Sequence, residues 1–427
     1  MTDEKKLNGV IYHRKGIRIL RVWGTPEDMG YAHGYLLAQE IMDGVSELIG
    51  VGGLQYQNVL RACQRRLIAP AWAKAEAVGL LKGLQDALPP AKRKIAALGR
   101  EIGLLDLWAV NTYSEWTGLG CSSVSAWGSI TRDGHTLLAR NLDYMPFDTC
   151  TRNHVVIARK PKDGTAWVSF CWPGALGCYT GFSANGVAAM VHDAWACKQK
   201  RNRQYVSRQV AFQALLQDVD NGPRFTANAA DALRRYPTIR GSSLHVAGRT
   251  GACVLEYDDD RTHDDGVTRR LPNVGETWLA CTNSFQARVD QGACGRLSHL
   301  SATMRELASY MTQMTDNDRL DLYDMWEIVG TVGNAITLQT VVVDTTTLDV
   351  LVGLAAADCP AHEKKPVKLA WEEFWTASDD GTRPAKPKAK VGSWLQRVLG
   401  GGQDAHKDFL KGATPDAAAL AKLLDGE

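Results

Sequence analysis

Residues 118–144 carry the side chains whose types and spacing suit nucleophilic chemistry. This segment, GLGCSSVSAWGSITRDGHTLLARNLDY, places Cys121 between Gly-Leu-Gly and two serines. An Asp-Gly pair between two alternating stretches predicts a β-hairpin that turns at Asp133-Gly134. The far strand of that hairpin would bring Arg140 and Asp143 back toward the cysteine.

A thiol at this place gains a base if the chain is cut just before Cys121. The freed α-amine has a pKa of about 7.7–8, so near neutral pH it can accept the thiol proton. Gly120 tolerates the strained backbone that such a cut requires. Arg140 would then orient the amine or the thiolate, and Asp143 would hold the ammonium or a substrate amine. The alternative is an ordinary hairpin with a buried Cys121 and a surface Arg–Asp pair.

Composition is that of an ordinary globular protein. The chain has 427 residues, of which 45% are hydrophobic and 22% charged, and its net charge is +2. This is enough for a large core in one or two domains, and it gives no electrostatic footprint for nucleic acid or an anionic membrane surface. The first residues have no apolar signal region, and no apolar run approaches the roughly 20 residues of a membrane helix. We therefore expect a soluble, cytoplasmic protein without a membrane span or a nucleic-acid partner.

The ten cysteines do not form a recognisable metal or disulfide pattern. They are dispersed without a C-x-x-C pair, and none of the ten histidines stands at zinc-finger spacing from a cysteine. Disulfides are not expected without an export signal. The sequence therefore predicts no metal and no cofactor, and most of these cysteines should be buried as small hydrophobic residues.

The order of the expected elements predicts an α+β fold with antiparallel sheets. A strand at 17–23 precedes a helix that starts at Thr25-Pro26, and the chain to about residue 117 is mostly helical. Strands and helices then follow in blocks and not in βαβ alternation. The expected strands are 122–131, 135–142, 154–160, 166–172, 187–192, 243–248, 252–257, 277–282, 336–344 and 347–354; the expected helices are 205–219, 226–235, 296–314 and 319–329.

Five motifs, in the expected order, resemble those of N-terminal nucleophile (Ntn) hydrolases of the choloylglycine hydrolase and acid ceramidase group. The segment from Cys121 resembles the start of their mature chain, which has a nucleophilic Cys, a D-G or N-G hairpin and then R-N-x-D-[YWF]. GTPEDMGYAHGYLL (24–37) resembles the prosegment motif of the acyl-coenzyme A:6-aminopenicillanate acyltransferase-like (isopenicillin N acyltransferase-like) branch. The other three similarities are GFSANGVAAMVHDA (181–194), SSLHVAGRTGACVLEY (242–257) and ACTNSF (280–285).

The resemblance implies a four-layer αββα sandwich of two antiparallel sheets, built from residues 121–355. The resemblance also implies that the chain has three parts. Residues 1–120 would be a helical prosegment that stays bound as the small chain after cleavage, and 121–381 the catalytic large chain. Residues 382–427 begin with a Pro/Lys/Ala linker and would be a solvated tail or a docking or oligomerisation element.

The resemblance also assigns roles to single residues. Cys121 matches the nucleophile, and Gly120–Cys121 matches the bond that autoproteolysis cuts. Arg140 and Asp143 match the charged pair that supports the thiolate, the amine and the substrate. Asn283 matches the asparagine that donates to the developing oxyanion.

Other assignments are looser. Arg296 matches a later arginine of the site, with less similar flanks. The sequence departs from the group at Ser183, where an asparagine is usual, and at His192 and Asp193, where a second oxyanion asparagine usually follows. Either His192 donates in its place, or Asp193 occupies the position and a backbone N–H has to donate.

Two aromatic residues beside these motifs, Trp127 and Tyr144, could wall the substrate pocket. Together the roles predict a self-cleaving amide hydrolase or acyltransferase acting on an N-acyl small molecule. The RNLD sequence at residues 140–143 is closer to the hydrolases of the group. The rival interpretations are a cysteine peptidase that acts on itself or on small peptides, and a non-catalytic or self-processing-only scaffold. The substrate and any homo-oligomer are left open.

Overall fold

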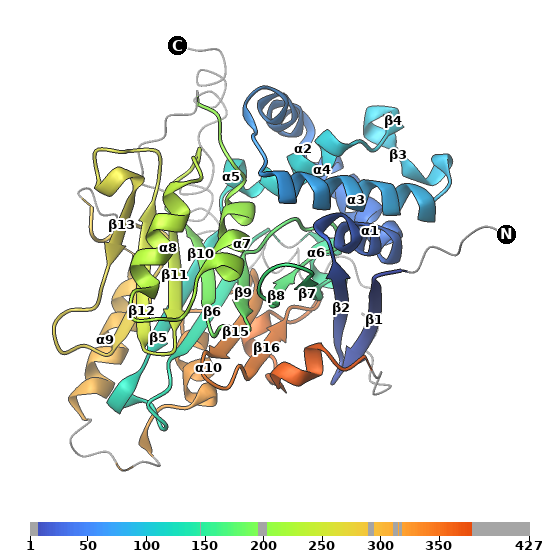
Figure 1. The fold of residues 1–427 in the computed structure, drawn as a ribbon. Helices are drawn as coiled ribbons and strands as arrows, with labels where there is room; N and C mark the ends of the chain where they lie inside the picture. Colours follow the sequence, from blue (N-terminus) through green and yellow to red (C-terminus); the bar gives the residue numbers. More distant parts are fainter. Residues whose placement is uncertain are drawn as a thin grey trace.

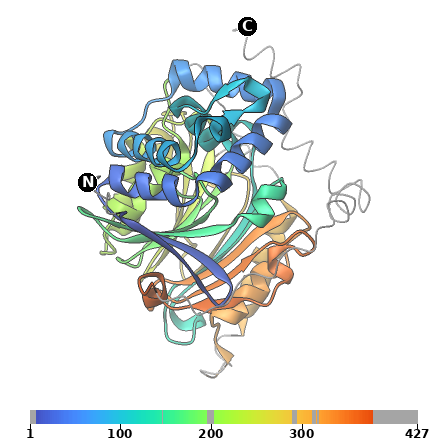
Figure 2. The ribbon, with the colours of Figure 1, turned by 90° about the vertical axis from the view of Figure 1, so that its right-hand side faces the viewer.

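The two large β-sheets of the molecule pack face to face, and helices cover their outer faces. The computed structural model describes residues 7–145, 147–194, 203–288, 294–310, 315 and 318–377. Figure 2 shows the layers edge-on, with the helices drawn in blue at the top and the orange strands and helices below. The αββα sandwich expected from the sequence is confirmed.

The larger sheet has nine strands, and all neighbours are antiparallel except β2 and β7, which are parallel. In spatial order they are β1 (Gly9–Arg14), β2 (Ile17–Gly24), β7 (Val155–Pro161), β8 (Trp167–Cys171), β9 (Thr180–Ser183), β10 (Ala188–Asp193), β11 (Ser242–Gly248), β12 (Gly251–Tyr257) and β13 (Val267–Arg270). The first 120 residues therefore contribute a β-hairpin to a sheet that was expected from residues 121–355.

The smaller sheet has six strands and contains the hairpin predicted around Asp133-Gly134. In spatial order they are β14 (Trp278–Cys281), β5 (Gly120–Ala126), β6 (Leu137–Asp143), β15 (Thr337–Asp344), β16 (Val350–Leu354) and β17 (Val367–Leu369). β5 and β6 are antiparallel, with Cys121 opposite Leu142 and Ser123 opposite Arg140. Because side chains alternate along a strand, Cys121, Ser123 and Ser125 share one face of β5.

That face of β5 points toward the nine-stranded sheet. Leu138 and Val341 from the smaller sheet pack with Phe182 and Met190 from the larger one in a fully buried core. His245 of β11 lies between the sheets, its ring nitrogens 2.8 Å and 2.9 Å from the hydroxyls of Ser123 and Ser125. Burial lowers the pKa of His245 to about 3, so this bridge between the sheets is uncharged at neutral pH.

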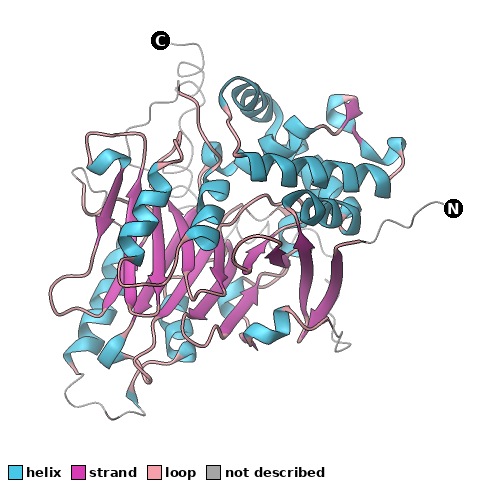
Figure 3. Ribbon diagram, viewed as in Figure 1, coloured by secondary structure: helices cyan, strands magenta, loops and turns pink. Residues whose placement is uncertain are grey.

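Helices form the outer layers (Figures 1 and 3). They are α1 (Pro26–Leu36), α2 (Ala38–Arg66), α3 (Ala71–Ala87), α4 (Leu104–Thr112), α5 (Ser114–Thr117), α6 (Asp148–Arg152), α7 (Arg208–Asp218), α8 (Phe225–Arg234), α9 (Gly295–Ser309) and α10 (Leu322–Gly330). α7 and α8 pack on the nine-stranded sheet, and α9 and α10 cover the six-stranded one. As predicted, Thr25 caps α1, and its hydroxyl accepts from the Asp28 N–H at 3.2 Å.

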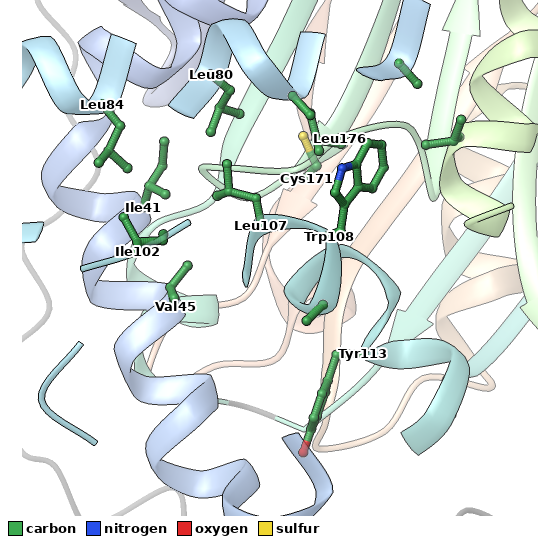
Figure 4. Close-up of a cluster of buried hydrophobic side chains, with 14 of the residues drawn as sticks. Ile41, Val45, Leu80, Leu84, Ile102, Leu107, Trp108, Tyr113, Cys171 and Leu176 are labelled. Carbon is green, nitrogen blue, oxygen red and sulfur yellow. The ribbon is translucent and has the colours of Figure 1, made fainter. Parts of the chain in front are cut away.

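The first helices pack on the outer face of the nine-stranded sheet, over β2 and β7. Figure 4 shows Ile41 and Val45 of α2, Leu80 of α3 and Leu107 of α4 in one buried cluster with Leu176, which follows β8. The helical residues before Cys121 therefore share a core with the sandwich.

Helices α1 and α3 approach each other unusually closely. A Cβ atom on Gly34 would lie 1.9 Å from the Leu80 carbonyl oxygen, and one on Gly83 would lie 2.0 Å from the Tyr31 carbonyl oxygen. Gly30 and Gly79 make equivalent contacts with the facing backbone. Four glycines thus let the two helix backbones touch.

One expected helical stretch differs. Between α3 and α4 the chain forms short 3-10 turns and a two-stranded ladder of β3 (Lys94–Ile95) and β4 (Arg100–Glu101), because Gly99 turns the chain with φ 66°. No helix in the described ranges is long and apolar enough to cross a membrane. The predicted linker and tail, 382–427, lie outside the described residues.

Candidate active site

Cys121 and Arg140 lie beside each other near the end of the β5–β6 hairpin, between the two sheets. Arg140 Nη2 donates to Cys121 Sγ at 3.0 Å, and both side chains are buried. The same guanidinium donates to the Tyr179 carbonyl at 2.7 Å and to the Val191 carbonyl at 2.6 Å. These acceptors belong to the nine-stranded side of the sandwich, so both sheets fix the position of the guanidinium next to the thiol.

Asn283, which follows β14, connects the groups around the cysteine. Its Oδ1 accepts from the Cys121 backbone N–H at 2.9 Å and from Arg296 Nη2 at 2.7 Å. Its Nδ2 donates to the Leu119 carbonyl at 2.8 Å and to the Asp193 carbonyl at 3.0 Å. An amide side chain has two N–H donors, so both donors of Asn283 are occupied.

Asp143 reaches the same group through Arg296. Arg296 Nη1 donates to Asp143 Oδ2 at 2.7 Å, and the Thr337 hydroxyl donates to Asp143 Oδ1 at 2.7 Å. Arg140 and Asp143 are three residues apart on β6, so they face opposite sides of the sheet and contact different partners. The structure therefore brings Cys121, Arg140, Asp143, Asn283 and Arg296 together.

The bond before Cys121 is close to Asp143. Gly120 is the first residue of β5, and a Cβ atom on it would lie 3.1 Å from Asp143 Cβ and 3.5 Å from Asp143 Oδ2. The left-handed backbone is not at Gly120 but at Gly118, with φ 90°. Gly118 turns the chain into the strand, and Gly120 is not among the glycines with a positive φ.

His192 does not have the geometry of an oxyanion donor. Burial, with the nearby Arg140 charge, lowers its pKa well below the usual value, so its ring is neutral. Nδ1 lies 3.2 Å from the Ser243 carbonyl, an acceptor, so the ring proton is on Nδ1 and Nε2 carries a lone pair. Nε2 has no hydrogen-bond partner among the described residues. This arrangement gives no support to the second donor expected from the sequence at His192.

Asp193 instead holds the segment before the cysteine. Its Oδ2 accepts the Leu119 N–H, and its Oδ1 pairs with Arg208 Nη1. Arg240 Nε lies 3.3 Å from Oδ2. All three charged side chains are buried. An ionised carboxylate with these partners accepts and cannot donate to an oxyanion.

Glu115, at the start of the same segment, extends this charged cluster. Its Oε1 accepts from the Arg208 backbone N–H at 3.0 Å. Burial raises the pKa of its carboxyl to about 7, although the Arg208 charge acts in the opposite direction. The arginines of this cluster were not predicted from the sequence, because Arg208 begins α7, Arg240 precedes β11, and neither lies in a recognisable motif.

An apolar cavity of about 120 Å³ adjoins the site. Val45 and Leu48 of α2 line it together with Leu119, Tyr144 and Tyr179. The cavity therefore lies between helix α2 and the sandwich, and two of its lining residues, Leu119 and Tyr144, are sequence neighbours of Gly120 and Asp143. Tyr144 lies where a pocket wall was expected.

Trp127 does not lie in the pocket. It follows β5 at the end opposite to Cys121, and its ring is 3.3 Å from where a Cβ atom on Gly251 would lie, at the β11–β12 turn. A strand rises about 3.3 Å per residue, so the length of β5 separates Trp127 from the cysteine. Trp127 is therefore not among the residues that line this cavity, because strand length and not sequence proximity decides which residues meet.

No cluster of three or more metal-ligating side chains is present in the described part of the chain.

Comparisons with known proteins found a sequence relative and several similar solved structures. No family model matches the chain. Protein dcd1B from Dictyostelium discoideum is 25% identical over 278 residues, a match that spans 58% of this chain and only 52% of that protein.

Three solved structures are similar. A Caenorhabditis elegans N-acylethanolamine-hydrolyzing acid amidase ortholog has 18% identity and a TM-score of 0.41, covering 53% of this chain and 93% of that one. The conjugated bile acid hydrolase of Clostridium perfringens has 10% identity and a TM-score of 0.40, covering 59% and 93%. Penicillin V acylase of Agrobacterium tumefaciens has 13% identity and a TM-score of 0.38, covering 62% and 89%. All three are Ntn hydrolases of the choloylglycine hydrolase and acid ceramidase group, the group that the sequence motifs resemble.

Proposed function

We propose that this chain is a self-activating amide hydrolase in which Cys121 becomes the N-terminal nucleophile. The observation that carries the proposal is the immediate surroundings of Cys121: Arg140 Nη2 on its sulfur at 3.0 Å and Asn283 Oδ1 on its backbone N–H at 2.9 Å. Both contacts hold the Cys121 sulfur and its backbone nitrogen in fixed positions.

Self-cleavage supplies the base. The Cys121 sulfur adds to the Gly120 carbonyl, the C–N bond to Cys121 breaks, and the thiol proton moves to the nitrogen, which becomes a free amine. Water then hydrolyses the thioester, so that Gly120 ends in a carboxylate and the sulfur regains a proton. The freed α-amine stays in contact with Asn283 Oδ1.

Turnover repeats this chemistry on an external amide. The α-amine takes the Cys121 proton, the thiolate bonds to the acyl carbon, and the amine product leaves with that proton. Water hydrolyses the thioester and releases the acid; an amine in place of water would make the enzyme an acyltransferase. Asn283 becomes an oxyanion donor once the Leu119 carbonyl leaves its Nδ2, because that contact occupies one of its two N–H groups before cleavage.

The apolar cavity would take the acyl group. An apolar cavity of roughly 150 Å³ holds a benzene molecule, so the about 120 Å³ beside this site is enough for a short branched chain or a small ring. The small and large chains would stay associated, because β1 and β2 precede the cut but pair within the nine-stranded sheet.

Cys121→Ala tests the proposal. Scaling 46.7 kDa by chain length, the wild type should give two bands of roughly 13 and 34 kDa on a denaturing gel, the larger one starting Cys-Ser-Ser-Val. The variant should stay uncut and hydrolyse none of a panel of short N-acyl amides. Cys171→Ala, a buried cysteine outside the site, should behave as wild type. An uncut wild type with full turnover would contradict the mechanism, and a cut chain without turnover would favour a self-processing-only scaffold.

A further inference from the structure

Leu119 makes three contacts that a bound substrate would make. Its N–H donates to Asp193 Oδ2, and its carbonyl accepts from Asn283 Nδ2 at 2.8 Å. Its side chain, only 2% exposed, lines the apolar cavity. One residue is thus bound through its nitrogen, its carbonyl and its side chain, immediately before the proposed cleavage site.

We propose that Leu119 occupies the acyl subsite in the uncut chain, and that the external substrate is an amide of an N-acylated apolar amino acid. This inference rests on the proposed function. When the cleaved end leaves, the substrate residue takes the place of Leu119. Its α N–H donates to Asp193, its side chain enters the cavity, and its carbonyl meets Asn283 Nδ2.

The position of Asn283 determines which substrate bond is cut. Asn283 contacts the Leu119 carbonyl through Nδ2 and the future α-amine of Cys121 through Oδ1, at 2.8 Å and 2.9 Å. A substrate carbonyl at the Leu119 position therefore lies beside both the oxyanion donor and the base. The reacting carbonyl is that of the apolar residue itself, so the amide on its C-terminal side is hydrolysed.

The charges around Asp193 select a neutral N–H over an ammonium. Arg208 and Arg240 both pair with this carboxylate, and Glu115 is the other acidic group of the cluster. The positive charge of the two buried guanidinium groups already equals or exceeds the negative charge of the two carboxyls, so a free α-ammonium would add an unpaired positive charge to a buried site. A neutral amide N–H adds a hydrogen bond without that charge.

The space beyond the nitrogen limits the N-acyl group. A Cβ atom on Gly118 would lie 3.0 Å from Arg240 Nη2 and 3.1 Å from Asp193 Oδ2. The substituent that replaces Gly118 must therefore be small, such as an acetyl group.

Three p-nitroanilides test the subsite in the cleaved wild-type protein: those of N-acetyl-leucine, of 4-methylpentanoic acid and of leucine. The second has the leucine side chain without the α-nitrogen, and the third has a free ammonium. A hydrogen bond to a charged group discriminates by roughly 10- to 100-fold, so the N-acetyl-leucine compound should exceed both others by this factor in kcat/KM.

Asp193→Asn should bring the ratio between the first two substrates close to one. Asp258→Asn is the matched control, since it removes another buried carboxylate, which pairs with Arg288 outside the site, and it should keep the wild-type ratio. If Asp193→Asn does not fold or is not cut, the wild-type ratio decides alone.

A wild-type ratio near one, in a protein that cleaves itself and hydrolyses N-acyl amides, would overturn the subsite and leave the proposed function intact. A faster rate with leucine p-nitroanilide would overturn the selection of a neutral N–H. An uncut chain that hydrolyses none of the three would contradict the proposed function and the subsite together.

Discussion

A single amide side chain connects the residues around Cys121. Asn283 contacts the nucleophile's backbone nitrogen, Arg296, the Leu119 carbonyl and the Asp193 carbonyl, so its four hydrogen-bonding positions are all used. In the proposed mechanism one of its N–H groups changes partner, from the Leu119 carbonyl to the oxyanion. The same group would thus hold the prosegment before cleavage and stabilise the transition state after it.

Asn283→Ala should lower kcat by about 10²–10³, the usual cost of removing one oxyanion donor. KM should change less, because the hydrogen bond strengthens mainly in the transition state. The measurement is steady-state kinetics on the fastest N-acyl amide of the panel, with protein that has been checked for cleavage. Full activity in the variant would remove the oxyanion role from Asn283.

Glu115 should make the stability of the uncut chain depend on pH. Burial raises the pKa of this carboxyl from 4.5 to about 7 in the folded chain. The folded chain then binds the proton more tightly than the unfolded chain. The resulting stabilisation is complete below pH 4.5 and is lost as the pH rises through 7.

Urea unfolding of Cys121→Ala with and without Glu115→Gln measures this contribution. The free energy of unfolding of the parent, relative to the Gln variant, should fall by up to about 3 kcal/mol between pH 5 and pH 8. The Gln variant serves as the reference because all other titrating groups are shared. Parallel pH profiles for the two proteins would contradict the assignment.

At the scale of elements, local signals in the sequence predicted what local interactions determine. The cap at Thr25 and Pro26 predicted the start of α1, and Asp133-Gly134 predicted the β5–β6 hairpin that positions Arg140. The sequence did not indicate β9 or β17, whose four and three residues are too short for a periodic pattern. Nor could it show that β2 pairs in parallel with β7, since that pairing depends on the whole sheet.

The sequence likewise predicted those site residues that belong to a local motif, and it did not predict those that meet only through tertiary packing. Motif residues such as Cys121, Arg140 and Asn283 do lie together. The Asp193 cluster could not be found, because Arg208 and Arg240 meet Asp193 only through the packing of α7 and the strand before β11.

Because α1 and α3 contact each other so closely, we expect that replacing one of the four glycines at this contact lowers the stability of the fold. Gly83→Ala would place a Cβ atom 2.0 Å from the Tyr31 carbonyl oxygen, so the helices must separate. We expect a loss of about 1–3 kcal/mol in the free energy of unfolding, as for other overpacked sites. Gly50→Ala in α2 is the control, because nothing lies within 4 Å of the added methyl group; it should gain about 0.5–1 kcal/mol. If urea unfolding gave the same change in the free energy of unfolding for Gly83→Ala and Gly50→Ala, α1 and α3 would be able to move apart freely.

For the whole molecule, residues 367–377, which comprise β17 and the segment after it, contact the N-terminal hairpin. The Tyr12 hydroxyl donates to the Glu373 carbonyl at 3.0 Å, and Lys15 Nζ donates to the Lys368 carbonyl at 2.8 Å. Trp371 packs edge-on against Phe182, with ring centroids 5.5 Å apart. Residues 367–377 therefore link the part of the chain before the proposed cut to the part after it, in addition to the β2–β7 pairing.

Two C-terminal deletions should separate this segment from the tail. Removing residues 383–427 should leave self-cleavage and amide hydrolysis unchanged, because the described contacts with the hairpin end at Thr376. Removing residues 367–427 also takes away β17 and the contacts with β1, so the small chain should then be held chiefly by the β2–β7 pairing and by the helical core. We expect the first protein to elute as one complex of both chains in size-exclusion chromatography, and the second to lose small chain or aggregate.

Loss of soluble protein after the shorter deletion would show that the tail packs on the body. An intact complex after the longer one would show that the sheet pairing and the helical core hold the chains together without this segment.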